Sequence, residues 1–261
     1  MALHHLFHNL EVNPRAIEEI CPCLLPPSAL PTHAIAIAPN KKEAVKSFAK
    51  IQNWTLVFTD GSCTSEGVGA AAVLYVDYQH LATLHYRLGS ASEHTVFKAE
   101  ATALLLAAHL LTSNTEVTFP ASILADNQAV IRSTKPGHYL LMHFRSMIQD
   151  LHKSNRLSRK DIMLQWIAGH MEIEGNELAD REAKLAAKRD EPTSPPEALP
   201  PALAERLPLS VSTLKQTHAT KLKVLWNNEW WGSPHYSRIS CIDPLLPGNT
   251  FVKLTASLPK R

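Results

Sequence analysis

The chain has 261 residues, a formal net charge of +2 and 45% apolar residues, a composition typical of a globular protein. This length predicts one domain of about 150 residues with flanks, or two small domains. No run reaches the roughly 18 apolar residues of a membrane span, and the N-terminus lacks the pattern of a signal peptide. Four scattered cysteines do not make a disulfide framework. We therefore expect an intracellular protein of the nucleus or cytoplasm, neither secreted nor bound to a membrane.

The charge is unevenly distributed along the chain. Residues 51–190 carry 13 basic and 15 acidic side chains, whereas residues 191–261 carry 8 basic and 5 acidic ones. The middle of the chain therefore does not indicate nucleic-acid binding by bulk charge. Any contact with a phosphate backbone there would need bound cations and local side chains.

The first half of the chain predicts an irregular segment followed by three strands. Residues 1–50 contain six prolines and little periodicity, with one short helix expected at 41–50. Apolar and β-branched residues predict strands at 54–59, 67–76 and 79–88. A two-residue turn, Asp77-Tyr78, separates the second and third strands and predicts an antiparallel hairpin.

The second half alternates between helical and strand-like runs. The run from Val96 is apolar on nearly all sides, which predicts a buried helix. The remaining elements follow from periodicity and from the Pro136-Gly137 break. We expect helices at 96–111, 128–133, 139–153 and 176–188, strands at 122–125 and 162–167, and a loop at 169–175.

This element order predicts an α/β protein. A β-meander followed by alternating elements indicates a five-stranded mixed sheet, three antiparallel strands and then parallel ones, with flanking helices. A proline-rich run after Asp190 marks a boundary. We expect an irregular N-terminal segment at 1–50 and the main domain at 51–190. A proline-rich linker at 191–203 and a small helical extension at 204–261 would follow.

Four acidic residues in separate contexts are the candidate site. Asp60 and Asp126 each follow an apolar strand-like run, while Glu100 and Asp180 lie in helix-like runs. Ligands of α/β sheets gather outside the carboxyl ends of strands, so the two aspartates would lie side by side if their strands are neighbours. Closely packed carboxylates ionise together only when cations lie between them, and hard oxygen ligands select Mg²⁺ or Mn²⁺. This pattern predicts a divalent-metal site.

These residues also carry a family resemblance. Thr59-Asp60-Gly61-Ser62, Ala99-Glu100, Asp126-Asn127-Gln128, Trp166 to His170 and Gly175 to Asp180 resemble, in order, the motifs of the type 1 ribonuclease H family. The likeness covers roughly residues 53–190, and five aligned segments make it specific. It implies a ribonuclease H-like fold and an endonuclease that hydrolyses the RNA strand of RNA–DNA hybrids with two magnesium ions, Mn²⁺ being an alternative.

The resemblance also implies roles for individual residues. Asp60, Glu100, Asp126 and Asp180 would hold the metal ions, and His170 would be the histidine of a mobile loop that assists proton transfer or product departure. Substrate contacts would come from Gln128 and from the backbone near Ser62 and Cys63. The partner would be an RNA–DNA hybrid, recognised through its shape and 2′-hydroxyl groups. We expect a monomer.

The flanks resemble those of this domain in fungal non-LTR (LINE-type) retrotransposon polyproteins. The family's long basic handle is absent between Asp126 and Ile162, as in some retroelement members. A small basic group at Lys153, Arg156, Arg159 and Lys160 is expected near the active edge, where it could contact phosphates. A basic run with Trp226, Trp230 and Trp231 could bind nucleic acid, although tryptophans at helical spacing favour packing.

Each acidic residue also has an ordinary structural interpretation. Asp60 could cap a turn, Asp126-Asn127 could cap a helix, and Glu100 and Asp180 could be surface residues. Two other functions remain open. The chain could be a catalytically weak or inactive nucleic-acid-binding remnant of a retroelement, or another metal-dependent nuclease of the same superfamily.

Overall fold

The computed structural model describes most of the chain in two compact units. The larger unit comprises Arg15–Ser210, and the smaller one includes the chain from Val211. The described residues are 13–19, 32–133, 138–169, 173–188 and 193–241. The predicted domain of residues 51–190 lies inside the larger unit, which also takes in residues from both predicted flanks.

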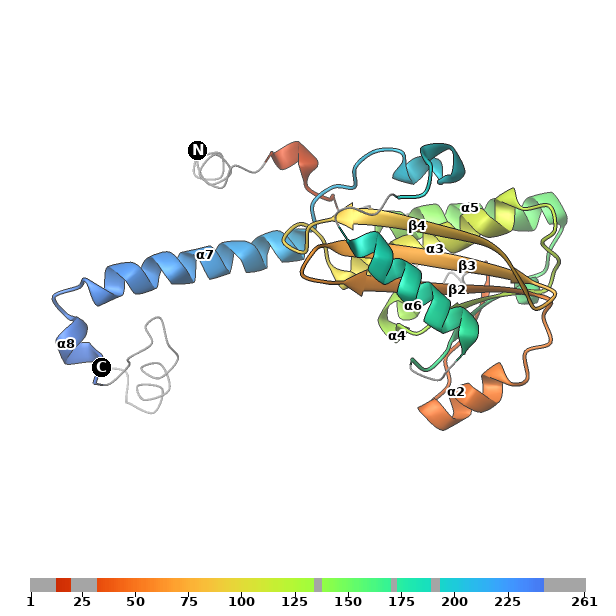
Figure 1. The fold of residues 1–261 in the computed structure, drawn as a ribbon, viewed down its shortest axis with the longest axis horizontal. Coiled ribbons are helices and arrows are strands. Elements are labelled where there is room, and N and C mark those ends of the chain that lie inside the picture. The colour runs from red at the N-terminus through yellow and green to blue at the C-terminus, as the bar shows by residue number, and fades with distance from the viewer. Residues whose placement is uncertain (1–12, 20–31, 134–137, 170–172, 189–192, 242–261) are drawn as a thin grey trace, which may run out of the picture. The chain divides into compact units, whose positions relative to one another are not determined.

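A mixed sheet forms the centre of the larger unit (Figure 1). The strand order is β1-β6-β5-β2-β3-β4, with β2, β3 and β4 antiparallel and β1, β6, β5 and β2 parallel. The predicted α/β class with a mixed sheet is therefore confirmed. The strands are β1 Ala34–Ala36, β2 Thr55–Cys63, β3 Val68–Val76, β4 Gln79–Gly89, β5 Ala121–Ala125 and β6 Ile162–Trp166.

The number of strands corrects the prediction of five. The sixth, β1, comes from the segment expected to be irregular and pairs in parallel with β6, Ala34 opposite Met163. Only three residues pair, too few to show the alternation by which a strand is recognised in sequence. The predicted turn between β3 and β4 is present, since Asp77 and Tyr78 both have positive φ, 49° and 61°, as a type I′ turn requires.

Helices cover both faces of the sheet. The long helices α3 and α5 pack against each other and cover one face, and α6 covers the other across β2, β3 and β4 (Figure 1). The Thr95 hydroxyl caps α3 by accepting from the Lys98 backbone N–H at 3.2 Å. The helices are α2 Lys41–Phe48, α3 Val96–Ser113, α4 Gln128–Arg132, α5 Tyr139–Asn155 and α6 Glu174–Ala187, with short 3₁₀ turns at Pro14–Ala16, Arg159–Asp161, Pro196–Ala198 and Pro201–Leu203.

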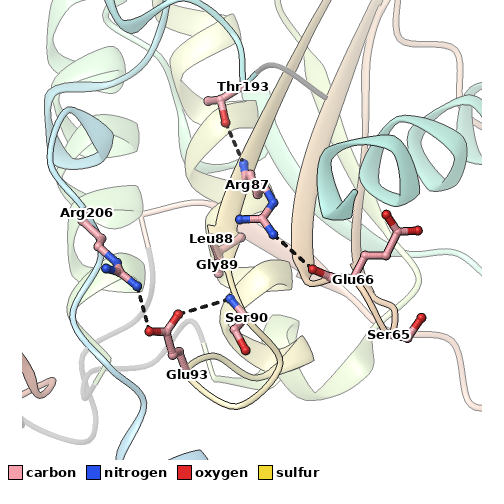
Figure 2. Close-up of a pocket in the computed structure, with 9 residues that line it drawn as sticks. All are labelled: Ser65, Glu66, Arg87, Leu88, Gly89, Ser90, Glu93, Thr193 and Arg206. Atoms are coloured by element: carbon pink, nitrogen blue, oxygen red, sulfur yellow. Dashed lines mark hydrogen bonds and ion pairs between the residues drawn. The ribbon is translucent and has the colours of Figure 1, made fainter. Parts of the chain in front are cut away.

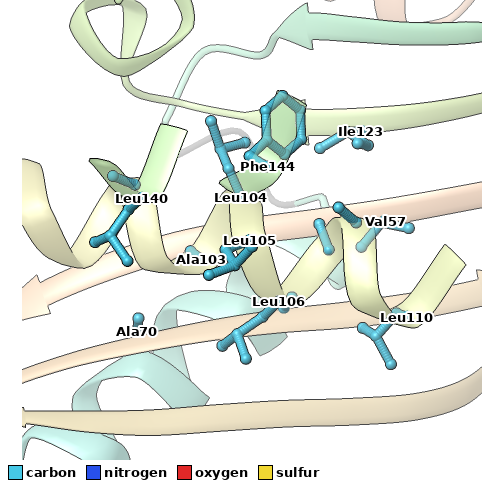
Figure 3. Packing of buried hydrophobic residues seen from close by; sticks show 14 of the residues in the cluster. Val57, Ala70, Ala103, Leu104, Leu105, Leu106, Leu110, Ile123, Leu140 and Phe144 are labelled. Atoms are coloured by element: carbon cyan, nitrogen blue, oxygen red, sulfur yellow. The ribbon is translucent and has the colours of Figure 1, made fainter. Parts of the chain in front are cut away.

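The main core lies between the sheet and α3. Leu104 and Leu105 are fully buried, beside Phe144 of α5 and Ile123 of β5 (Figure 3). Helix α3 is the one helix among the described residues that is long and apolar enough to cross a membrane, but most of it is buried inside the protein. Its apolar character is that of a core helix, as predicted.

Two flanking segments outside the predicted domain dock at the start of α3. Ile17 and Leu209 form a parallel bridge, and the Glu18 backbone N–H donates to the Leu209 carbonyl at 2.9 Å. Between them they receive the Lys98 ammonium, which donates to Glu18 Oε2 at 3.2 Å and to the Pro208 carbonyl. The Lys98 side chain is only 1% exposed, and its charge is paired with Glu18 while a hydrogen bond to the Pro208 carbonyl comes from the other end of the unit.

The smaller unit is helical where the structure describes it. Helix α7 spans Val211–Trp231, and α8 spans Tyr236–Ile239. Trp230 of α7 meets the ring of Tyr236 edge to face, with centroids 5.7 Å apart.

Candidate metal centre

The sheet register brings Asp60 and Asp126 side by side, where the pairing of the parallel strands β2 and β5 ends. Strands β2 and β5 run in parallel, and their last paired residues are Thr59 and Ala125. The next residue on each strand is an aspartate, so the two carboxylates leave the sheet side by side. One expectation needs correction: β2 does not end at Asp60 but runs on to Cys63, because β3 continues to pair with it after β5 has ended.

Glu100 reaches the same place from α3. The helix lies very close to β2 at Gly61, where an added Cβ would come within 2.8 Å of the Ala99 carbonyl carbon. A side chain at position 61 would therefore push α3 away from the strand. The glycine that follows Asp60 lets the helix bring Glu100 against the aspartates.

Three carboxylates converge at this edge. One carboxylate oxygen from each of Asp60, Glu100 and Asp126 lies within 4.8 Å of the others. Asp60 and Glu100 are only 8% and 4% exposed. Oxygen atoms at this spacing can share a divalent cation, and the set contains only the hard ligands that Mg²⁺ and Mn²⁺ prefer.

The electrostatics of the cluster are unfavourable without a cation. Burial, followed by the charges of Asp126 and Asp180, raises the pKa of Asp60 to about 7. Burial, followed by the charges of Asp60 and Asp126, raises the pKa of Glu100 to about 9. Both shifts show carboxylates that are costly to ionise where they lie. A bound divalent cation would reverse that cost.

Glu100 has an incomplete set of partners. Its Oε1 accepts a hydrogen bond from Asn127 Nδ2 at 3.3 Å. Its Oε2 is buried and has no hydrogen-bond partner among the described residues. A buried carboxylate oxygen without a hydrogen-bond partner, on a residue that converges with two other carboxylates, fits a cation ligand, because such an oxygen is otherwise expensive to keep.

Asp180 lies beside the cluster but is not one of the three convergent residues. It is carried by α6, and its Oδ2 accepts from Lys184 Nζ at 2.6 Å, one helical turn further on. Its charge nevertheless reaches Asp60, whose pKa it raises. The four predicted carboxylates thus divide into a group of three and a neighbour that is paired with a lysine.

Contacts with β6 and the loop after it hold Asp126 in place. Trp166 Nε1 donates to the Asp126 carbonyl at 2.9 Å, and the Ile167 backbone N–H donates to the Ala125 carbonyl at 3.0 Å. Gly169 lies against the carboxylate, since a Cβ there would come within 2.9 Å of Asp126 Oδ2. The Trp-Ile-Ala-Gly run noted in the sequence therefore shapes the site around Asp126.

The predicted substrate contacts lie close to these carboxylates in the chain. Ser62 is half-buried near the end of β2, and Cys63 is an exposed free thiol at its last residue. Gln128 begins α4, and its Oε1 accepts from the Arg132 guanidinium at 3.1 Å. His170 lies outside the described residues.

The basic group at 153–160 is not near the active edge, contrary to expectation. It precedes β6, whose first residue, Ile162, pairs with Ala121 at the start of β5. Asp126 follows the other end of β5, about 17 Å away along a five-residue strand. These basic residues therefore lie towards the N-terminal ends of β5 and β6, and the carboxylates lie at the C-terminal end of β5.

A polar hollow of about 520 Å³ lies apart from the cluster, and none of the four carboxylates lines it (Figure 2). Its two guanidinium groups are already engaged. Arg87 donates to the Glu66 carbonyl at 3.0 Å, and Arg206 pairs with Glu93 at 2.7 Å. We assign no ligand to it. Its lining residues are Ser65, Glu66, Arg87, Leu88, Gly89, Ser90, Glu93, Thr193 and Arg206.

Three residues near the site were not singled out for it from the sequence. Asn127 was expected only as a helix cap; it accepts from the Ala129 backbone N–H at 2.9 Å and also holds Glu100. Lys184 places a cation beside Asp180, a pairing that the i, i+4 spacing could have revealed. Lys41 of α2 donates to the Gly169 carbonyl at 3.2 Å, and no sequence signal links those two positions.

Several solved structures are similar to part of this chain. RNase H1 from the halophilic archaeon Halobacterium salinarum is 19% identical, with 51% of this chain and 96% of that chain covered and a TM-score of 0.37. The N-terminal RNase H domain of a Mycobacterium tuberculosis protein is 22% identical, with coverages of 51% and 91% and a TM-score of 0.36.

The foamy viral protease–reverse transcriptase in complex with RNA/DNA hybrid is 19% identical, with coverages of 65% and 22% and a TM-score of 0.41. The match thus spans only about a fifth of that viral chain. Comparison with curated proteins gave no match.

A family profile decides the assignment. The profile described as RNase H matches residues 52–188, a stretch that includes all four carboxylates and more than half of the chain. The mixed sheet with flanking helices is accordingly the RNase H-like fold. The chain belongs to the RNase H family.

Proposed function

We propose that the protein is an endonuclease that hydrolyses the RNA strand of RNA–DNA hybrids by a two-metal-ion mechanism. The observation that carries this proposal is the convergence of Asp60, Glu100 and Asp126, with oxygen atoms within 4.8 Å of one another in a family of nucleases. Carboxylate clusters of this kind can hold the two metal ions that assist phosphodiester hydrolysis.

Asp60, Glu100 and Asp126 would hold Mg²⁺, or Mn²⁺, with Asp180 completing the set from α6. When bound, a pair of such ions activates water and stabilises the leaving oxygen. The protein's own groups prepare this chemistry. Asn127 orients Glu100, and Trp166 holds the backbone at Asp126. His170 is proposed to move a proton at the leaving 3′ oxygen.

Substrate selection is proposed to rest on shape. A protein separates RNA from DNA at one strand through the 2′-hydroxyl, and base sequence is not needed for this. Backbone groups at Ser62 and Cys63, with the Gln128 amide, are the proposed contacts. We also propose a monomer that acts inside the cell and that derives from a LINE-type retroelement. These proposals rest on sequence resemblance.

The test is cleavage of a labelled RNA–DNA hybrid by the full chain in Mg²⁺. We expect cutting of the RNA strand, with single-stranded RNA and duplex DNA left largely intact, and loss of cutting in EDTA. Asp126→Asn is the inactive control. Wild-type protein that cuts no better than Asp126→Asn would favour a non-catalytic binding module, and cutting of duplex DNA would favour another nuclease of the superfamily.

A further inference from the structure

A segment outside the family region reaches the end of the sheet where the carboxylates lie. Strand β1 and helix α2 precede the stretch that the RNase H profile matches. Strand β1 runs parallel to β6, with Ala36 opposite Gln165, and β6 runs parallel to β5. The chain therefore leaves β1 at the end of the sheet where β5 leads to Asp126. Residues 37–40 then connect β1 to α2, whose first residue is Lys41.

Helix α2 is anchored on strand β2. The Asn40 side chain caps the helix by accepting from the Glu43 backbone N–H at 3.0 Å. The ring of Phe48 lies beside that of Phe58 of β2, with centroids 6.3 Å apart, and Ala44 is only 1% exposed. The helix is therefore attached to the domain two residues before the first aspartate of the cluster.

Lys41 is the lysine of α2 that faces the domain. At about 100° per residue, it lies within about 60° of Ala44 and Phe48, the two side chains that pack inward. Its Nζ donates to the Gly169 carbonyl at 3.2 Å. By the same geometry, Lys42 lies at least about 100° from each of those three helical residues and points away from the domain.

Gly169 connects the Lys41 ammonium to the carboxylates. A Cβ at Gly169 would come within 2.9 Å of Asp126 Oδ2, so the backbone that accepts from Lys41 lies directly against that carboxylate. Lys41 is exposed and forms no ion pair within the described part of the chain. An ammonium has three N–H donors, and Gly169 takes one of them. A positive charge with free donors is therefore held beside the carboxylate cluster.

We propose that Lys41 binds a backbone phosphate of the nucleic-acid substrate. The inference rests on the proposed function, which brings a phosphodiester to the neighbouring carboxylates. Those carboxylates repel a polyanion wherever bound cations do not neutralise them, and an ammonium held beside them offsets the repulsion. A phosphate contact of this kind positions the strand and does not depend on base sequence.

The hydrogen bond to Gly169 distinguishes Lys41 from an ordinary surface lysine. A long side chain that moves freely in solvent loses conformational entropy when it is fixed by a ligand. Lys41 is already restricted by Gly169, so less entropy is lost when a phosphate binds. A lysine that served only to hold Gly169 would leave the electrostatic attraction of the substrate unchanged, and the dependence of binding on salt separates these two roles.

The test is fluorescence anisotropy of a labelled RNA–DNA hybrid at several salt concentrations, with the full-length Asp126→Asn chain so that the hybrid is not cut. We expect Lys41→Gln, added to this chain, to weaken binding about threefold to fivefold at low salt, as for an exposed ion pair. It should also reduce the slope of log K against log salt by about 0.9, the value for one phosphate contact on a duplex. Lys41→Arg keeps the charge and should keep the slope.

The matched control is the adjacent lysine. Lys42→Gln removes an equal charge from a side chain that points away from the domain, and it should change neither the affinity nor the slope. Equal effects of Lys41→Gln and Lys42→Gln would overturn the inference. An unchanged slope in Lys41→Gln would do the same, even if Mg²⁺ then raised the unfolding temperature less than in wild type, because Lys41 would only hold Gly169.

Failure of the proposed function gives a different result. A wild-type chain that cuts the hybrid while Lys41→Gln keeps its slope overturns the role of Lys41 alone. A chain that binds the hybrid through Lys41 without cutting it contradicts the nuclease and leaves the phosphate contact standing. A chain that does not bind the hybrid at all overturns both.

Discussion

Helix α3 carries two buried charges that are treated in opposite ways. Lys98 and Glu100 are two residues apart and are 1% and 4% exposed. The lysine forms an ion pair with Glu18 and donates to the Pro208 carbonyl, while the glutamate faces two more carboxylates and leaves one oxygen without a partner among the described residues. A buried charge that stabilises a fold is paired within the chain, whereas one that waits for an ion is not.

The largest expected effect is on activity, and it is expected at Glu100. Glu100→Gln keeps the shape of the side chain and removes the charge, so we expect hybrid cleavage to fall by about a thousandfold or more, because several kcal/mol of transition-state stabilisation depend on the cations. The same variant should unfold at a higher temperature than wild type in EDTA, because repulsion is relieved. Cleavage rates and thermal unfolding measure the two effects. A Glu100→Gln protein that is both inactive and less stable would mean that the glutamate is a structural residue.

Substitutions in the Lys98–Glu18 pair should change stability instead. Glu18→Gln leaves the Lys98 ammonium buried without its counter-charge, and we expect it to lower the free energy of unfolding by about 3 kcal/mol. Lys98→Met should cost less, because the Glu18 side chain that remains is 19% exposed and can be hydrated. Urea denaturation of both variants at pH 7 gives the comparison. A larger loss in Lys98→Met than in Glu18→Gln would contradict the proposed pairing.

The dependence of stability on pH should also distinguish the carboxylate cluster from the Lys98–Glu18 pair. Asp60 and Glu100 have pKa values raised by burial to about 7 and about 9, so in the absence of metal their protonated forms favour the folded state. Their contribution is complete below their ordinary pKa values near 4 and is lost as the pH rises through about 7 and then about 9. We expect Asp60→Asn to flatten this decline in metal-free thermal unfolding. An unchanged slope would indicate that Asp60 is not buried with its neighbours.

The smallest effect is expected at the exposed ion pair. Lys184 and Asp180 are 56% and 33% exposed and lie one turn apart on α6, so their pairing contributes little. Lys184→Gln should change the free energy of unfolding by no more than about 0.5 kcal/mol. A loss in urea denaturation as large as that of Glu18→Gln would remove the distinction between buried and exposed pairs.

Local patterns predicted the elements that build the site, but not what surrounds it. The apolar runs that lead to Asp60 and Asp126 and the long apolar helix from Val96 were readable because each is a continuous run, although β2 continues beyond Asp60 to Cys63. The pairing of Lys98 with Glu18 spans 80 residues and has no local signature. The basic group before Ile162 was assigned to the wrong edge, because its position depends on the direction of β6, which the pairing with β5 determines.

Metal-dependent stabilisation tests the central claim most directly, namely that Asp60, Glu100 and Asp126 converge in order to bind divalent cations. Thermal unfolding of the wild-type chain at pH 8 should shift upward as Mg²⁺ or Mn²⁺ is added, since a ligand that binds only the folded state stabilises it. The shift should be absent in Glu100→Gln and unchanged in Lys184→Gln. Equal shifts in wild type and Glu100→Gln, or none in either, would contradict the account.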